Sequence, residues 1–334
     1  MRLGSRTFLA VVCLLVISPA QSPCEAANPS GTLPARIEAA FGQRSGAAVL
    51  MRVSDGRIMQ VHNPQLACRT LHPPGSIFKL VTAFAALVEG VISESDTLEC
   101  GGQIRLGGVV LHCTVPNGHG RVNIESAISK SCNVFFYNLG ARLGADRITA
   151  YARLMGLASA VPSYAGPQAI GQVPARCAHP SEVARLAIGQ APGLGITLLQ
   201  AAEMVRRIAV PHATPLSGGE RGKFLPGNTA RIAFLGGGTK VGVRAAQEAV
   251  RRGMRLAVQC GTCKQAALRG VRVAGKTGSP EAPNSDNQRS AWFVGFAPYE
   301  KPEVVVVVFV KRGHGFDTAA PIARRIFEAW FGRK

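Results

Sequence analysis

The feature that most constrains the fold of this 334-residue chain is an apolar run near its C-terminus. Residues 304–310 read VVVVVFV, so a strand formed there is apolar on both faces. Such a strand belongs in the middle of a sheet, because only there are both of its faces covered. The run therefore predicts a central strand with helices packed on each face of its sheet.

Further strand-like runs lie at both ends of the chain. Residues 47–60 place Asp55-Gly56 between two such runs, which predicts a hairpin. Strands are also expected over residues 271–274 and 290–296, with a turn over 298–302 before the final strand. Since these runs lie far apart in the sequence, we expect one sheet assembled from both ends of the chain.

The patterns between these runs are helical. They predict a closing helix over residues 319–331 and earlier helices over 76–90, 123–142, 145–156, 181–189 and 197–209. The fold class expected is α+β: an antiparallel sheet built from N- and C-terminal strands, flanked by helices, with an inserted all-helical lobe over roughly residues 90–235. A groove between the sheet and the lobe is the expected place for chemistry.

The first residues have the order of a secretory signal peptide. Arg2 and Arg6 precede an apolar run over residues 8–17, and small residues follow up to Ala26. The run is about half of the ~20 residues that a membrane-spanning helix needs. We expect residues 1–26 to be a signal peptide, 27–44 a leader with a short helix, and 45–332 the functional domain, with no separate N-terminal pedestal domain. The expected location is the periplasm or the outer face of the cytoplasmic membrane.

Composition excludes some classes of protein. Hydrophobic residues make up 47% of the chain and charged residues 17%, which is typical of a globular protein. The net charge is +19, but the basic residues are scattered, without zinc-finger spacing or a basic helix with interleaved aromatics. We therefore expect no nucleic-acid partner. An anionic wall polymer or a membrane surface remains a candidate partner.

The segment around Ser76 is the first that carries chemistry. It reads Pro-Pro-Gly-Ser-Ile-Phe-Lys over residues 73–79, ahead of an apolar run. Ser76 and Lys79 would lie one turn apart on one face of a helix. A serine needs a base to become a nucleophile, and burial near a helix N-terminus lowers the pKa of a lysine. The alternative is a helix-capping serine with a surface lysine.

Two more short motifs follow in the chain. Ser131-Cys132-Asn133 places a hydroxyl and an amide after a helical run, where the alternative is a helix cap. The sequence Lys-Thr-Gly-Ser over residues 276–279 fits carboxylate recognition beside a strand edge, where the alternative is an ordinary strand end. No upstream glycine pattern makes this segment a phosphate-binding loop.

The ordered set of motifs is more specific than its parts. Ser-x-x-Lys, Ser-x-Asn and Lys-Thr-Gly occur in the order typical of penicillin-binding proteins and serine β-lactamases. The chain resembles the transpeptidase domain of class B penicillin-binding proteins over about residues 45–331. Further stretches that carry the resemblance are GHGRVNIESAISKSCNVFFYNLG (118–140), AIGQAPGLGITLLQAAEM (187–204), AGKTGSPEA (274–282) and SAWFVGFAP (290–298).

The resemblance implies an activity and a role for each motif. Ser76 would attack the penultimate D-alanyl carbonyl of a peptidoglycan stem peptide, with Lys79 as general base. Ser131 would relay a proton, and Lys276 completes the catalytic set. The substrate-binding residues would be Asn133, Thr277, Gly278 and Ser279. The resemblance also implies that β-lactams are covalent inhibitors, and no cofactor or metal is expected.

Two other functions remain open from the sequence. A serine β-lactamase would share the acylation step but needs a base for rapid hydrolysis, for which Glu182 and Glu203 are the remaining candidates. A non-catalytic penicillin-binding module would keep the fold without turnover.

Export would place the cysteines in an oxidising compartment, where disulfides form. With Cys132 taken as a free thiol packed against the core, the expected pairs are Cys100–Cys113, Cys260–Cys263 and Cys68–Cys177. The histidines His112 and His119 near the first pair leave metal binding as the alternative.

Overall fold

The computed structural model describes residue 1 and residues 31–210, 242–281 and 288–332. The signal-peptide prediction over residues 1–26 falls almost entirely outside the described residues. The described residues from Thr32 onward form one compact unit. Within the described ranges, no helix combines the length and the apolar character needed to cross a membrane.

The sheet is built from both ends of the chain, as the sequence predicts. It has five antiparallel strands in the order β2-β1-β9-β8-β7. The N-terminal hairpin pairs β1 with β2 and has Asp55-Gly56 in its turn. The bounds are β1 Gly46–Arg52, β2 Ile58–His62, β7 Ala274–Gly278, β8 Ala291–Ala297 and β9 Val304–Val310.

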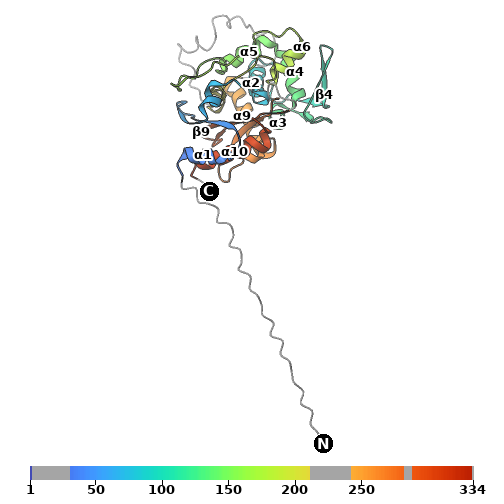
Figure 1. Ribbon diagram of the computed structural model, residues 1–334. Helices are drawn as coiled ribbons and strands as arrows, with labels where there is room; N and C mark the ends of the chain where they lie inside the picture. Colours follow the sequence, from blue (N-terminus) through green and yellow to red (C-terminus); the bar gives the residue numbers. More distant parts are fainter. Residues whose placement is uncertain (2–30, 211–241, 282–287, 333–334) are drawn as a thin grey trace. The chain divides into compact units, whose positions relative to one another are not determined.

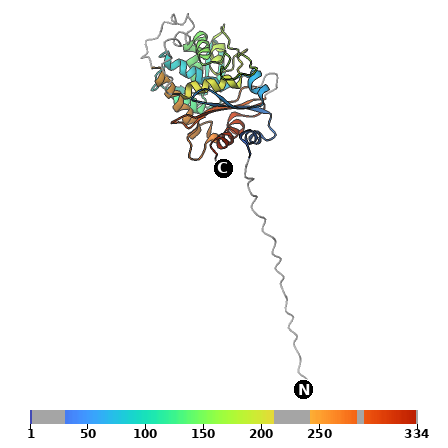
Figure 2. The ribbon, with the colours of Figure 1, turned by 90° about the vertical axis from the view of Figure 1, so that its left-hand side faces the viewer.

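The VVVVVFV run is the central strand β9, and it is buried on both faces. Val305, Val307 and Phe309 belong to the core beneath the inserted helices. The alternate valines belong to a second core against α1 (Leu33–Phe41) and α10 (Ala320–Trp330). Figures 1 and 2 show these two helices on one face of the sheet and the inserted segment on the other.

Helix α1 belongs to the folded unit, although a leader was expected over residues 27–44. Ile37 and Phe41 are buried in the second core, and the Phe41 ring stacks on His62 of β2 at 4.5 Å. The domain therefore closes its outer face with one helix from each end of the chain.

The inserted segment lies between β2 and β7 and carries most of the helices. The prediction of an all-helical lobe is wrong in one respect, because this segment also contains two small antiparallel sheets. They pair β3 (Leu98–Cys100) with β6 (Gly120–Val122), and β4 (Gln103–Leu106) with β5 (Val109–His112). The glycine-rich stretch between Cys100 and Cys113 forms the β4–β5 hairpin, and β3 pairs with β6, which lies beyond this hairpin in the chain.

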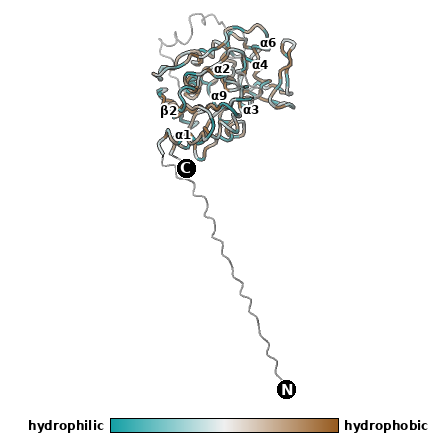
Figure 3. Tube along the Cα trace, in the orientation of Figure 1, coloured by the Kyte–Doolittle hydropathy of each residue, from teal (hydrophilic) through white to brown (hydrophobic). Residues whose placement is uncertain are grey.

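The helices of the segment differ from the predicted ones in two places. The expected helix over 123–142 is two helices, α3 and α4, broken at Ser131-Cys132, and α9 was not predicted at all. Several of the buried residues of α9 are small alanines, and they lie along the chain between hydrophilic residues (Figure 3). The helices are α2 Lys79–Val88, α3 Ile124–Lys130, α4 Asn133–Leu143, α5 Ala145–Leu154, α6 Pro180–Ala187, α7 Leu198–Ala209 and α9 Val243–Cys260.

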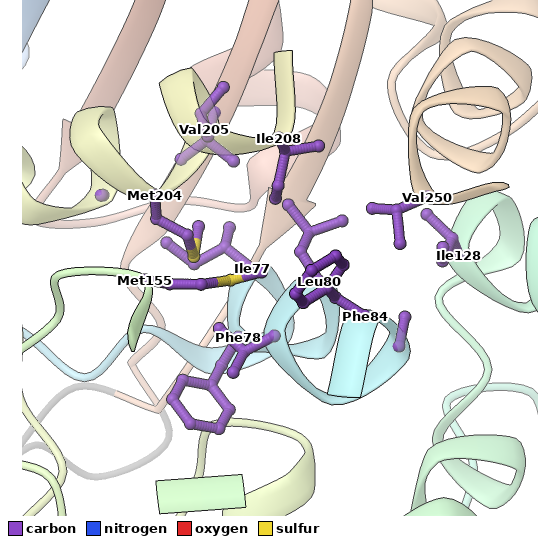
Figure 4. Packing of buried hydrophobic residues seen from close by; sticks show 14 of the residues in the cluster. Ile77, Phe78, Leu80, Phe84, Ile128, Met155, Met204, Val205, Ile208 and Val250 are labelled. Atoms are coloured by element: carbon purple, nitrogen blue, oxygen red, sulfur yellow. The ribbon is translucent and has the colours of Figure 1, made fainter. Parts of the chain in front are cut away.

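Helix α2 is the buried axis of the molecule. All of its residues up to Leu87 are buried, and it follows a short 3-10 turn over Gly75–Phe78. Figure 4 shows Ile77, Leu80 and Phe84 packed among side chains of α7 and α9. Because neighbours enclose this helix on all sides, its first turn, which carries Lys79, is held in a fixed position.

We expect Phe41→Ala to lower the free energy of unfolding by about 3–5 kcal/mol, because it leaves a cavity beneath the sheet. Urea denaturation monitored by circular dichroism measures the change. Glu38→Ala, on the exposed face of the same helix, is the matched control and should change stability by about 0.5 kcal/mol or less. An unchanged stability of Phe41→Ala would show that α1 is a leader outside the cooperative unit.

Candidate active site

Ser76 lies in the 3-10 turn that leads into α2. The preceding Gly75 has φ of +53°, and a Cβ there would lie 2.9 Å from Pro280 Cδ. Its N–H donates to Gly189 O at 3.0 Å. Only glycine fits this left-handed, closely packed position, so the turn is fixed between β7 and the inserted segment. Ser76 itself is half-buried.

The Ser131-Cys132-Asn133 motif forms the break between α3 and α4. Ser131 has φ of +57° and ψ of +41°, a left-handed conformation that is uncommon for a residue with a Cβ. Cys132 then caps α4, and its Sγ accepts from Phe135 N at 3.5 Å. The reversal directs Ser131 and Asn133 toward the first turn of α2, because both contact Lys79.

Lys79 is fully buried at the start of α2, and all three of its N–H donors have acceptors. Its Nζ donates to Asn133 Oδ1 at 2.6 Å, to Ser131 O at 2.8 Å and to Ser131 Oγ at 3.2 Å. Burial lowers the pKa of Lys79 well below its ordinary value, and the neighbouring Lys276 ammonium lowers it further. Lys79 can therefore lose its proton under conditions in which an exposed lysine would keep it.

Lys276 approaches the same hydroxyl from the sheet. It lies on β7, the edge strand, and its Nζ donates to Ser131 Oγ at 2.9 Å and to Thr277 O at 2.8 Å. Burial lowers the pKa of Lys276 to about 8. Within the described residues its third N–H has no hydrogen-bond acceptor.

The strand that carries Lys276 differs from the prediction. The sequence predicted a strand over 271–274, with the motif at its end, whereas β7 spans Ala274–Gly278. The backbone of Lys276 pairs with Val294 of β8. The Lys-Thr-Gly part of the motif is therefore held in register by the sheet, and no strand of the described residues pairs with the other edge of β7.

The remaining predicted residues line the same region. Thr277 is buried, and its hydroxyl donates to Thr262 Oγ1 at 2.9 Å. A Cβ on Gly278 would lie 3.0 Å from Pro74 O, so this glycine permits the strand to approach the serine turn. Ser279 Oγ accepts from Gly315 N at 2.9 Å. Thr262 was missed by the sequence analysis, because a single threonine after a helix carries no motif.

Among the predicted catalytic residues, Ser76 is the one that stands apart from the hydrogen-bonded group of Lys79, Ser131 and Lys276. No hydrogen bond joins its Oγ to another side chain of the described residues. Ser76 and Lys79 are still one turn apart, and catalytic contacts in ligand-free sites are often longer than in complexes. The structure therefore brings Lys79, Ser131, Asn133 and Lys276 together and places Ser76 beside them.

A second cluster of reactive groups lies directly behind the Ser131 turn. The ligand atoms of Cys100, Cys113, His119 and Cys132 all lie within 4.8 Å of one another. His119 Nδ1 is 3.7 Å from Cys100 Sγ and 3.3 Å from Cys113 Sγ, and Cys113 Sγ is 4.0 Å from Cys132 Sγ. A tetrahedral zinc ion with bonds of about 2.3 Å spaces its ligands about 3.8 Å apart, so these four residues could hold one.

The cluster changes the interpretation of the cysteines from disulfide bonds to metal ligands. The seven cysteines of the described residues are free thiols, and none of the three expected disulfides is present. Cys132 is buried against the core as expected. Its thiol is not isolated, however, because Cys113 lies beside it. His112, named beside His119 as a metal candidate, is not part of the cluster. Spacing along the chain does not distinguish a disulfide from a set of metal ligands, whereas the convergence of three thiols on one imidazole favours the metal.

A helical lobe on a five-stranded antiparallel sheet, with two lysines and a serine hydroxyl between them, defines the serine acyltransferases of the penicillin-binding class. The sequence profile of the penicillin-binding protein transpeptidase domain matches residues 46–328. The chain therefore belongs to this family.

Known relatives agree with this assignment. The peptidoglycan D,D-transpeptidase PbpA of Mycobacterium tuberculosis is 27% identical over 340 residues, covering 86% of this chain and 67% of PbpA. The peptidoglycan D,D-transpeptidase MrdA of Acinetobacter baumannii is 28% identical over 79% of this chain and 43% of its own length. The crystal structure of Pseudomonas aeruginosa PBP2 superposes with a TM-score of 0.73 at 25% identity, covering 89% of this chain and 76% of that one. The chain thus spans about two thirds of PbpA and less than half of MrdA.

We expect the rate of acylation by benzylpenicillin to rise and then fall as pH increases. The rate should rise as Lys79 loses its proton, and it should fall as pH rises through about 8, where Lys276 loses the charge that attracts the drug's carboxylate. Stopped-flow measurement of the second-order rate constant across this range tests the expectation. A rate that keeps rising well above pH 8 would contradict the role of the Lys276 charge.

We also expect the purified protein to retain about one zinc ion per chain, measured by elemental mass spectrometry after dialysis. Cys100→Ser should remove the ion and lower the melting temperature. Cys260→Ser, which changes an exposed cysteine outside the cluster, should leave both unchanged. A metal-free protein that lacks two titratable thiols, with Cys100 linked to Cys113, would restore the disulfide prediction.

Proposed function

We propose that this chain is an exported penicillin-binding serine acyltransferase that acts on D-Ala-D-Ala peptidoglycan stem peptides. It would work as a D,D-transpeptidase or D,D-carboxypeptidase through an acyl-enzyme at Ser76. The observation that carries the proposal is the convergence of Lys79 and Lys276 on the hydroxyl of Ser131. Membership in a family with relatives named D,D-transpeptidases supports it.

The base in this mechanism is Lys79. Its three hydrogen bonds are those of an ammonium group, which has no lone pair to accept a proton. The loss of one proton, which its lowered pKa favours, creates that lone pair one turn from Ser76. Lys79 would then take the proton of Ser76 as its oxygen attacks the carbonyl carbon.

The acid in the following step, in which the bond to the leaving nitrogen breaks, is Ser131. Its oxygen accepts from Lys79 and from Lys276, so both of its lone pairs are occupied. Its own proton is therefore directed away from both lysines and can pass to the leaving nitrogen, while Lys79 replaces it. The substrate's terminal carboxylate would bind Lys276 and Thr277, and Asn133 would bind the amide of the substrate.

The carbonyl oxygen needs donors as its charge develops. Backbone N–H groups of Ser76 and Ser279 are the proposed oxyanion hole, since both flank the closely packed junction of the serine turn and β7. The acyl group would then pass to an amine of a neighbouring stem peptide or to water.

The β-lactamase alternative is weakened by the positions of its two candidate bases. Glu203 is held by Arg206 and Arg207 through three hydrogen bonds of 2.7–2.9 Å. Glu182 accepts from the backbone N–H of Ala178 at the start of α6. Both carboxylates are occupied by structural partners, so neither is free to activate a hydrolytic water.

Export follows from the proposed substrate as well as from the first 26 residues, because stem peptides are cross-linked outside the cytoplasm. The arginine-flanked apolar run supports a signal peptide. The same location would expose the site to β-lactams, which would inhibit it by acylating Ser76.

Intact-mass spectrometry with benzylpenicillin tests the proposal. We expect one stable adduct per chain, and Ser76→Ala should reduce its rate of formation at least about 10³-fold, because the nucleophile is lost. Ser163→Ala, an exposed serine far along the chain, is the matched control and should be labelled normally.

Two results would contradict the proposal. A chain that remains unlabelled is a non-catalytic module. An adduct that forms and disappears within seconds, with hydrolysed drug accumulating, is the signature of a β-lactamase.

A further inference from the structure

Thr277 has a hydroxyl partner that none of the catalytic motifs contains. Its Oγ1 donates to Oγ1 of Thr262 at 2.9 Å. A hydroxyl has one proton to donate and two lone pairs to accept with. If Thr277 gives its proton to Thr262, it has none left for a substrate carboxylate.

Thr262 is held firmly in the turn that follows α9. Its N–H donates to Ser129 O at 3.1 Å. The neighbouring Gly261 packs so closely on Ser129 that a Cβ there would lie 2.3 Å from Ser129 Oγ. On the other side, Cys263 is fully buried, and its N–H donates to Ala257 O at 2.9 Å. Three consecutive residues are thus fixed by their backbone or by packing.

This turn connects two of the elements that carry the catalytic motifs. Ser129 lies at the end of α3, two residues before Ser131, and Thr277 lies on β7 beside Lys276. Thr262 is hydrogen-bonded to both elements, through its backbone to Ser129 and through its side chain to Thr277. Thr262 is also half-buried rather than sealed in the core.

We propose that Thr262 is a positioning residue for the carboxylate-binding site, acting through the hydroxyl of Thr277. When a carboxylate binds, the direction of the hydrogen bond between the two threonine hydroxyls reverses. Thr262 then donates to Thr277, and Thr277 donates its own proton to the carboxylate. The two bonds lie in one chain ending on a charge, which strengthens both. This assignment rests on the proposed function, since it assumes that Thr277 receives the carboxylate.

The test compares acylation by benzylpenicillin, which has a free carboxylate, with acylation by its methyl ester, which does not. Thr262→Val keeps the shape of the side chain and removes the hydroxyl. We expect it to lower the second-order rate constant for benzylpenicillin by about three- to tenfold, the effect of one neutral hydrogen bond. The rate with the methyl ester should not change, and Thr262→Ser should restore the rate with benzylpenicillin.

A double-mutant cycle separates positioning from general damage to the fold. Thr277→Val should slow acylation more than Thr262→Val does, and the double variant should be no slower than Thr277→Val alone. Thr149→Val is the matched control, because it removes a hydroxyl that donates to Pro174 O in the inserted segment. Thr149→Val should leave the ratio of the acylation rates with benzylpenicillin and with its methyl ester unchanged.

Three results would overturn the assignment. They are an unchanged rate for Thr262→Val, an equal loss with the acid and the ester, or additive effects in the double variant. Failure of the wild-type chain to form any adduct is a different result, because it overturns the proposed function itself and the assignment with it.

Discussion

The site depends on the burial of two lysine ammonium groups around a single serine hydroxyl. Lys79 comes from the first turn of the buried helix, and Lys276 comes from the edge strand. Each is fully buried, and each donates to Ser131 Oγ. Removing one charged group from water costs several kcal/mol, and two like charges add repulsion. The arrangement persists only because the surrounding fold holds all three side chains in place.

The rest of the structure can be understood from the need to hold these three side chains in place. A central strand buried on both faces fixes the sheet, and the sheet fixes the register of β7. Helix α2 is enclosed by neighbours, so Lys79 cannot turn toward solvent. Ser131 takes a left-handed conformation that few side chains adopt, and the bonds from both lysines help to hold it there. The unfavourable electrostatics also lower the pKa of each lysine, which makes one of them a base.

Several features of the fold and of the candidate site could be predicted from the sequence. The VVVVVFV run indicated a strand buried on both sides, and Asp55-Gly56 indicated a hairpin. The three short motifs identified residues that the structure brings together from positions 52 and 145 residues apart. These predictions succeeded because each depended on a local pattern whose physical meaning hardly changes with context.

Other parts could not be predicted, for physical reasons. Residues 123–142 are compatible with one helix, and only the contacts of Ser131 with distant lysines show why it breaks. The short strands of the inserted segment carry weak periodic signals, and the amphipathic pattern of α9 was overlooked because small alanines make up much of its buried face. Thiols suited to disulfides or to a metal look alike along the chain until His119 is placed among them. The contact between Thr262 and Thr277 joins segments that have no common pattern.

The central claim is that burial makes Lys79 a base, and its pKa can be measured directly. Protein with ¹⁵N-labelled lysine, titrated by NMR with Lys79→Arg to assign the signal, reports the protonation of its Nζ. We expect Lys79 to lose its proton well below the ordinary lysine value of 10.5. A lysine that titrates at or above that value would contradict the account, because Ser76 would then have no base beside it.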